Sequence, residues 1–218
     1  MAASFARMKK GNAAGRASGV CAARGLAALA LVFLAHLEPA SAGVGEPAVT
    51  FYVAKISSAA GWEDVAIDPV GSGYVGAYLA AGALSGRYAR FRDGALQLEA
   101  EGQLVRHFGQ QQHWEFNGVP VVARWQRFPW NRSIATSAAF GLGLSYATEL
   151  PPVEVRLEGE SSRFLVYWVM ELTAGSPDGP WAASLRLHHR SVAYGLMGEE
   201  GGMNAVGLGV RYRFGAAR

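Results

Sequence analysis

The chain has 218 residues, of which 28 are glycine, 24 are aromatic and one is cysteine. That length suits a single domain with a substantial core, and one cysteine excludes a disulfide scaffold and any cysteine-rich metal site. The formal net charge of +3 arises in the leader, because residues 1–42 carry five basic side chains against one acidic one, whereas the remainder carries 15 against 16. The charge therefore gives no argument for binding nucleic acid, and we expect no nucleic-acid partner.

Residues 1–42 have the order of a secretory signal peptide. A basic segment precedes the apolar run 25–35, and Ala40, Ser41 and Ala42 then supply small residues at the cleavage site. The alternative is a membrane-anchoring helix, which needs about 20 apolar residues, whereas this run has eleven. We expect cleavage near Ala42 and an exported chain, residues 43–218, that forms a single domain.

The exported part predicts eight short strands separated by clusters of Gly, Pro, Asn and Asp. The expected strands are residues 47–57, 73–84, 94–106, 118–128, 133–147, 162–173, 182–191 and 204–214. Within 96–104, apolar or small residues at even positions alternate with Gln and Glu at odd positions, which is the period of a strand with two different faces.

Three features favour an all-β fold, an eight-stranded antiparallel transmembrane β-barrel, over a soluble sandwich or lipocalin-like barrel. The strands are near the 9–11 residues that cross a bilayer, they number about eight, and the leader exports the chain. A sandwich shows the same alternation, with its apolar face turned to the core. The last strand ends on the aromatic Phe214, as in outer-membrane barrels, although residues 215–218 follow it. We therefore expect the cell outer membrane as the location.

The most distinctive chemistry lies in residues 185–191. One face of this strand carries three potential cations and suits a polar lumen: Arg186, His188 and Arg190. The opposite face should then meet lipid: Leu185, Leu187, His189 and Ser191. A histidine two residues from a serine on one face can take the hydroxyl proton and create a nucleophile. The simpler alternative is a polar pair at the level of the lipid headgroups.

A third group for this pair is predicted by the parity of the last strand. Its lipid face runs through even positions from Asn204, and the turn 192–203 brings that residue beside the end of the preceding strand. Asn204 could therefore orient the His189 ring, although an amide stabilises an imidazolium less than a carboxylate does. Glu199 and Glu200 are the alternative acids, in a glycine-rich turn that fixes no side.

At these residues the chain resembles the lipid A 3-O-deacylases of Gram-negative outer membranes. The resemblance is carried by His189-Arg-Ser191, the Gly-rich turn and the strand 204–214, and segments 98–102, 107–109, 114–117 and 128–131 are similar to relatives of that family. It covers roughly residues 47–214. The resemblance implies an eight-stranded barrel with a Ser–His–Glu triad on its outer face, which hydrolyses the ester-linked acyl chain at the 3-position of lipid A without a metal cofactor.

The chain departs from that family pattern at two positions. Val192 stands where the pattern has an Asn that helps hold the oxyanion, and Asn204 stands where it has the acid. An oxyanion donor contributes about 3–4 kcal/mol, so the backbone N–H groups from Val192 and Ala193 onwards would have to replace the lost side chain.

The sequence therefore predicts an outer-membrane hydrolase, a lipid A 3-O-deacylase-like carboxylic ester hydrolase that acts on lipid A or lipopolysaccharide by a Ser–His mechanism. The alternative is a non-catalytic outer-membrane barrel, structural or adhesive, with a remnant site, and an exported soluble lipid-binding barrel comes third. We expect no cofactor and no metal, because His107, His113 and Glu115 match no standard metal spacing. A homodimer stays open. We also expect Arg186→Leu to be milder than Leu187→Arg, because Arg186 faces the lumen.

Overall fold

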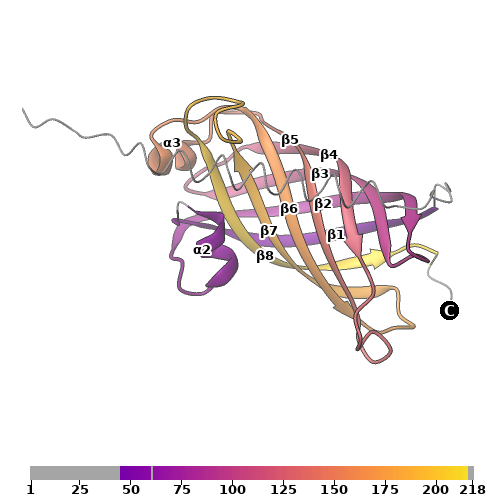
Figure 1. Cartoon of the computed structure of the whole chain (residues 1–218). Coiled ribbons are helices and arrows are strands. Elements are labelled where there is room, and N and C mark those ends of the chain that lie inside the picture. The colour runs from indigo at the N-terminus through magenta and orange to yellow at the C-terminus, as the bar shows by residue number, and fades with distance from the viewer. Residues whose placement is uncertain (1–44, 60, 216–218) are drawn as a thin grey trace, which may run out of the picture. The chain divides into compact units, whose positions relative to one another are not determined.

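The computed structural model describes residues 45–59 and 61–215, so the predicted signal peptide and its cleavage near Ala42 lie outside the described residues. In the described chain, eight antiparallel strands pair in sequence order, and the first pairs with the last to close a barrel (Figure 1). The strands are β1 (Gly45–Ser57), β2 (Tyr74–Phe91), β3 (Leu96–Gly109), β4 (Trp114–Trp125), β5 (Ala135–Ala147), β6 (Phe164–Gly175), β7 (Trp181–Ser191) and β8 (Gly202–Arg213). The predicted eight-stranded antiparallel barrel is confirmed.

Two strands differ most from their predicted bounds. β2 continues to Phe91, seven residues past the predicted end at 84, because its last residues pair with β3 beyond Arg87, which lies opposite Gly45 at the start of β1. β4 starts at Trp114 instead of 118, since a short turn after β3 lets the two strands pair from Arg106 and Trp114 onwards. The other strands agree with the prediction to within three residues at each end.

Two short helices, which the sequence analysis did not predict, lie in the loops at one end of the barrel (Figure 1). α2 (Trp62–Ile67) belongs to the β1–β2 loop, and α3 (Pro152–Glu158) belongs to the β5–β6 loop. α3 follows Pro151 and begins with Pro152, and proline is well suited to the first turn of a helix. No helix in the described ranges is long and apolar enough to span a membrane.

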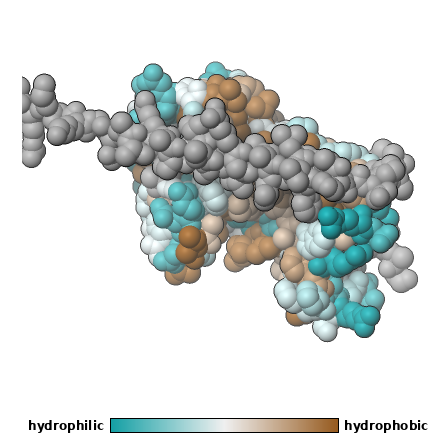
Figure 2. Space-filling view, viewed as in Figure 1, coloured by the Kyte–Doolittle hydropathy of each residue, from teal (hydrophilic) through white to brown (hydrophobic). Residues whose placement is uncertain are grey.

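The barrel is apolar outside and polar inside. Outward-facing Leu208 and Val53 are 67% and 64% exposed, whereas lumen-facing Arg186 and Glu171 are 1% and 2% exposed. On the face seen in Figure 2, hydrophobic residues form patches along the wall of the barrel. A soluble barrel or sandwich would have the opposite arrangement, since it must bury its apolar face. The structure is therefore a transmembrane β-barrel with a lipid-facing exterior.

A network of ion pairs fills the middle of the lumen. It joins three arginines and three glutamates from five strands, namely Glu99, Glu101, Arg124, Glu171, Arg186 and Arg211. Arg186 donates two hydrogen bonds to Glu101, at 2.9 and 2.8 Å, and a third to Glu171 at 3.0 Å. Buried charges are tolerated only when they are paired and hydrogen-bonded, so this network explains how the polar face of each strand can be buried.

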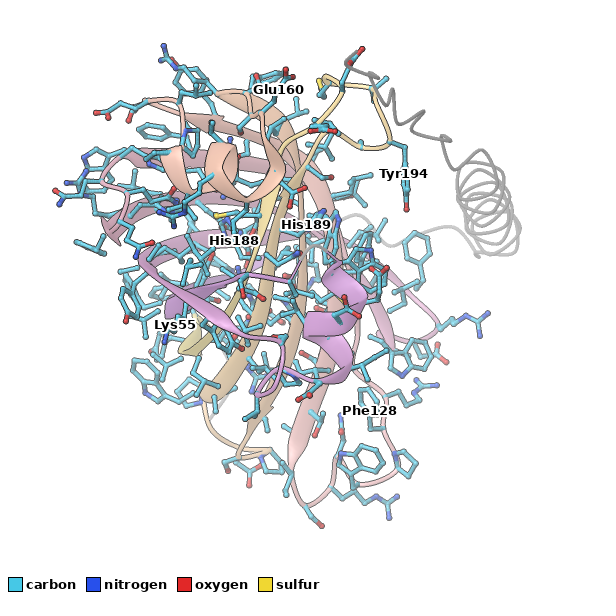
Figure 3. All side chains as sticks on the ribbon, turned by 90° about the vertical axis from the view of Figure 1, so that its left-hand side faces the viewer. Lys55, Phe128, Glu160, His188, His189 and Tyr194 are labelled. Carbon is cyan, nitrogen blue, oxygen red and sulfur yellow. The ribbon has the colours of Figure 1, made fainter. Side chains whose placement is uncertain are left out.

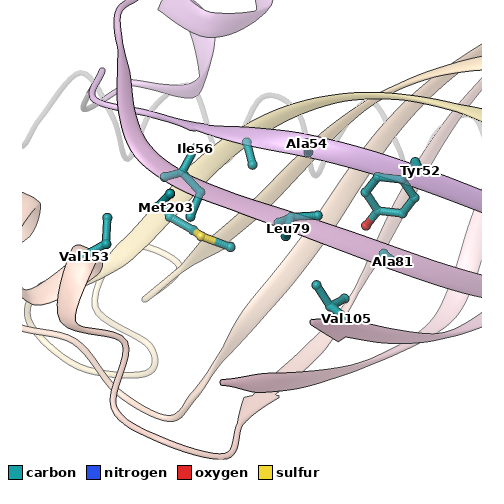
Figure 4. Packing of buried hydrophobic residues seen from close by; sticks show 10 residues of the cluster. Tyr52, Ala54, Ile56, Leu79, Ala81, Val105, Val153 and Met203 are labelled. Atoms are coloured by element: carbon teal, nitrogen blue, oxygen red, sulfur yellow. The ribbon is translucent and has the colours of Figure 1, made fainter. Parts of the chain in front are cut away.

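An apolar cluster lies inside the barrel between this network and the end that carries the helices. Side chains of β1, β2, β3 and β8 pack there, and Val153 of α3 closes the cluster (Figure 4). The members labelled in Figure 4 are Tyr52, Ala54, Ile56, Leu79, Ala81, Val105, Val153 and Met203. The helix is thereby anchored at this end of the barrel, which is the end where His189 and Ser191 lie.

Candidate active site on the outer face

Three side chains form a row across the outer face near the end that carries the helices. The strand register places Trp168 of β6 opposite His189 of β7, and His189 opposite Asn204 of β8. Because successive residues of a strand point to opposite faces, all three side chains project outward, as the parity of β7 and β8 predicted. Ser191 is two residues along β7 on the same face, at the last position of the strand.

Asn204 fixes the orientation and the tautomer of the His189 ring. His189 Nδ1 lies 2.7 Å from Asn204 Oδ1, and the Asn204 amide N–H donates to the Ala59 carbonyl at 3.3 Å. An amide oxygen can only accept a hydrogen bond, so Nδ1 carries the ring proton and Nε2 keeps a free lone pair. This tautomer is the one that a general base for a serine hydroxyl requires.

Two tryptophans cover the histidine. The Trp168 ring stacks on His189 with 4.3 Å between ring centroids, and Trp62 of α2 meets Trp168 edge-on at 5.4 Å. The view along the barrel from this end shows α2 beside His189 (Figure 3). His189 is consequently only 9% exposed. Sequence analysis missed both tryptophans, although Trp168 could have been found by pairing β6 with β7 in register.

The serine hydroxyl makes a different contact from the predicted one. Ser191 Oγ accepts a hydrogen bond from the Ala193 backbone N–H at 3.3 Å, and among the described residues no hydrogen bond joins it to His189. Ala193 and Tyr194 have positive φ values of 49° and 59°, so the chain turns back sharply after the strand. The oxyanion region predicted at Val192 and Ala193 thus lies against the serine, with the Ala193 N–H engaged by it.

The two alternative acids are placed elsewhere. Glu199 and Glu200 are exposed in the β7–β8 loop, and Glu200 lies against the end of α3, where a Cβ on Gly159 would meet its carboxylate at 3.2 Å. Burial, and then the Glu200 carboxylate, raise the pKa of Glu158 above its ordinary value. Among the described residues, His189 Nδ1–H donates to Asn204 Oδ1, so of the three candidate partners for the ring the structure brings only Asn204 to His189.

A second cluster lies inside the barrel. His107 of β3, His113 of the β3–β4 turn and Glu115 of β4 are all buried, and each offers a ligand atom within 4.8 Å of the others. The lumen-facing His188 approaches Glu115 Oε1 to 3.0 Å. The spacing along the sequence gave no metal signature, because the tight turn and not a helical repeat brings these side chains together.

The comparisons with known proteins add little to this geometry. No family model matches the chain, and no curated protein matches it. A solved structure, described as the crystal structure of Neisserial surface protein A (NspA), is similar with a TM-score of 0.48 and 13% identity. The similarity covers 79% of this chain and 99% of that one. The resemblance to the lipid A 3-O-deacylases therefore stays a prediction.

Proposed function

We propose that this protein is an outer-membrane ester hydrolase that removes an ester-linked acyl chain from lipid A or a related lipopolysaccharide. Ser191 is the nucleophile, His189 is the base and Asn204 orients the base. The observation that carries the proposal is the 2.7 Å contact between His189 Nδ1 and Asn204 Oδ1 on the outer face, because it leaves Nε2 free to accept a proton.

The lipid-facing exterior supports a membrane lipid as the substrate. The site lies on the outside of the barrel, and neighbouring outward residues of β6, β7 and β8 are apolar, including Leu172, Leu185 and Leu208. An acyl chain lying along these strands would place its ester near the end of β7 without leaving the bilayer. A water-soluble ester would have no such guide.

The proposed reaction needs one local movement. Ser191 must turn its hydroxyl away from the Ala193 N–H and toward His189 Nε2, and its Cα–Cβ bond is the one about which the hydroxyl changes rotamer. His189 then takes the hydroxyl proton as Oγ bonds to the ester carbonyl carbon, and it returns that proton to the leaving alkoxide as the C–O bond breaks. The same base activates the water that hydrolyses the acyl-serine. The movement also frees the Ala193 N–H to donate to the oxyanion.

Mass spectrometry of lipid A from cells that express the protein tests the proposal. Cells with the unchanged protein should lose one acyl chain from lipid A, and the variants Ser191→Ala and His189→Ala should each restore the full mass. Ser133→Ala, in an exposed turn at the opposite end of the barrel, is the matched control and should keep the activity. Heat-modifiable gel migration shows that each variant has folded. If lipid A is unchanged by the unaltered, folded protein, a non-catalytic structural or adhesive barrel is the better account.

A further inference from the structure

The β3–β4 hairpin holds the cluster of His107, His113 and Glu115 inside the barrel, whereas Ser191 lies on the outer face. We propose that this cluster binds one divalent transition-metal ion, and that its two imidazoles and one carboxylate suit Zn²⁺. Nitrogen and oxygen ligands of this kind form three-residue zinc sites, with a water or a further oxygen completing the coordination.

The first argument is an unsatisfied histidine. His113 is 1% exposed, and neither of its ring nitrogens has a hydrogen-bond partner. Burying polar nitrogens without partners is costly, so such a group calls for a ligand that the side chains around it do not supply. The amide oxygen of the neighbouring Gln111 is buried and also lacks a partner. Two unsatisfied electron-pair donors therefore lie at the same turn.

The second argument is the spacing of the ligand atoms. A tetrahedral ion with bonds of about 2.1 Å needs ligand atoms roughly 3.4 Å apart, and one atom from each of the three side chains lies within 4.8 Å of the others. His107 Nε2 is already 2.8 Å from Glu115 Oε2. The His113 ring stacks on that of His107 at 4.1 Å and must turn for its lone pair to reach the ion. No hydrogen bond restrains this turn.

The third argument is the presence of supporting contacts behind the ligands. Gln111 Nε2 lies 2.9 Å from His107 Nδ1, on the ring edge away from Glu115. His188 Nε2 approaches the other carboxylate oxygen, Oε1, to 3.0 Å, without the direction of a good hydrogen bond. Metal ligands usually have such outer partners, which hold ring and carboxylate in place. In this arrangement the ion takes the position of the proton between His107 and Glu115. The His107 ring then carries its proton on Nδ1, and the Gln111 amide turns so that its unpaired Oε1 accepts from Nδ1–H.

The local charge allows a cation. Arg190 Nε lies 3.9 Å from Glu115 Oε2, which opposes a second positive charge. Arg190 also pairs with the buried carboxylate of Glu154 in α3. The single guanidinium of Arg190 is thus shared between two carboxylates and does not belong to Glu115 alone. The ion would thus join the β3–β4 turn to the ion pair between Arg190 and Glu154 beneath α3, and it would stabilise this end of the barrel.

The test is metal analysis of the protein, purified from membranes in detergent without a polyhistidine tag. The protein is treated with a chelator, dialysed against Zn²⁺ and analysed by mass spectrometry of the metal. Replacement by Co²⁺ gives a visible absorption spectrum that reports the ligand geometry. We expect one zinc ion per chain and a Co²⁺ spectrum of four or five coordination with nitrogen and oxygen ligands.

Two variants and a control complete the experiment. His113→Ala removes a ligand, and Glu115→Gln keeps the size of the side chain but removes its charge. Each should weaken zinc binding by more than the roughly 10–100-fold that loss of an outer partner costs. His189→Ala, which removes a histidine from the outer face, should bind zinc unchanged. A folded protein that binds no zinc, with water satisfying His113, would overturn the proposal. Zinc that both variants retain, or that His189→Ala loses, would do so as well.

Discussion

Replacing Arg186 by leucine should destabilise the barrel severely, contrary to the expectation drawn from the sequence. Arg186 is 1% exposed and donates three hydrogen bonds to two buried carboxylates. Without it, Glu171 keeps Arg124 at 2.6 Å, but Glu101 keeps only the uncharged Gln103 amide. Leaving a buried charge without its ion-pair partner costs about 3–5 kcal/mol, and we expect Arg186→Leu to lose that much.

The comparison variant carries a charge on the opposite face. Leu187→Arg is the comparison that the sequence suggested for Arg186→Leu, but Leu187 is only 7% exposed, so Leu185 on the same face, 40% exposed near the middle of β7, is the better lipid-facing comparison. An arginine at Leu185 should cost about 2–4 kcal/mol if it lies near the bilayer midplane. Arg186→Leu should therefore be at least as harmful as Leu185→Arg. The face on which Arg186 lies does not decide the cost of replacing it, because the lumen supplies two carboxylate partners that the strand pattern does not show.

A second change restores stability if this account is right. Arg186→Leu combined with Glu101→Leu removes the stranded carboxylate, and replacing a buried ion pair by apolar side chains is often close to neutral. The double variant should recover to within about 2 kcal/mol of the unchanged protein. Urea unfolding in lipid vesicles, followed by tryptophan fluorescence, measures all of these differences. A loss below about 1 kcal/mol for Arg186→Leu, or a double variant no more stable than the single one, would refute the reasoning.

Three further predictions concern the outer face and the loops beside it. Asn204→Asp keeps the shape of the contact with His189 and adds a charge that stabilises the imidazolium, so lipid A deacylation, measured by mass spectrometry, should hold level or rise, whereas a fall would contradict the assigned role. Trp168→Ala removes the ring that stacks on His189, a contact that contributes about 0.5–1.5 kcal/mol beyond burial. The loss in deacylation rate, converted to free energy, should exceed the loss in the free energy of unfolding measured in urea. The pKa of Glu158 is raised in the folded state, so ionisation of this carboxyl opposes folding. The free energy of unfolding should therefore fall as the pH rises from the ordinary pKa of Glu158 to its raised pKa in the folded protein. Glu200→Gln should lessen that fall, and the two proteins should be equally stable at acid pH, where Glu158 is protonated.

The sequence predicted the barrel because polar and apolar residues alternate along its strands with period two. Eight such strands in an exported chain leave few alternatives to a closed barrel. It also predicted the contact between His189 and Asn204, since a hairpin with known parity brings those positions together. The short helices were missed because six or seven residues in a loop show no helical periodicity. α3 also begins with a proline that resembles a break.

The sequence could not predict which side chains pair with the buried charges in the lumen or which ring stacks on His189 on the outer face. Glu171 is the register partner of Arg186 on the neighbouring strand β6, but Glu101 comes from β3, 85 residues away along the chain, and no local pattern pairs it with Arg186. The stacking of Trp168 on His189 needed the register between β6 and β7, which depends on the loop that connects them. The cluster of His107, His113 and Glu115 could not be predicted either, because a tight turn and not a regular spacing brings these side chains together.

The pairing of β1 with β8 has a consequence for the order of assembly. Asn204 lies on β8, and its amide is held by Ala59, which follows β1 in the chain, so the outer-face site draws on both ends of the domain. Contacts between residues so distant in sequence form late, because the loop that they close must be ordered first. The His189 tautomer is therefore fixed only when the last strand has been added to the first. Under the proposed hydrolase function, a chain whose barrel has not yet closed would carry Ser191 and His189 without the arrangement that the proposal requires, and activity would begin only with the finished barrel.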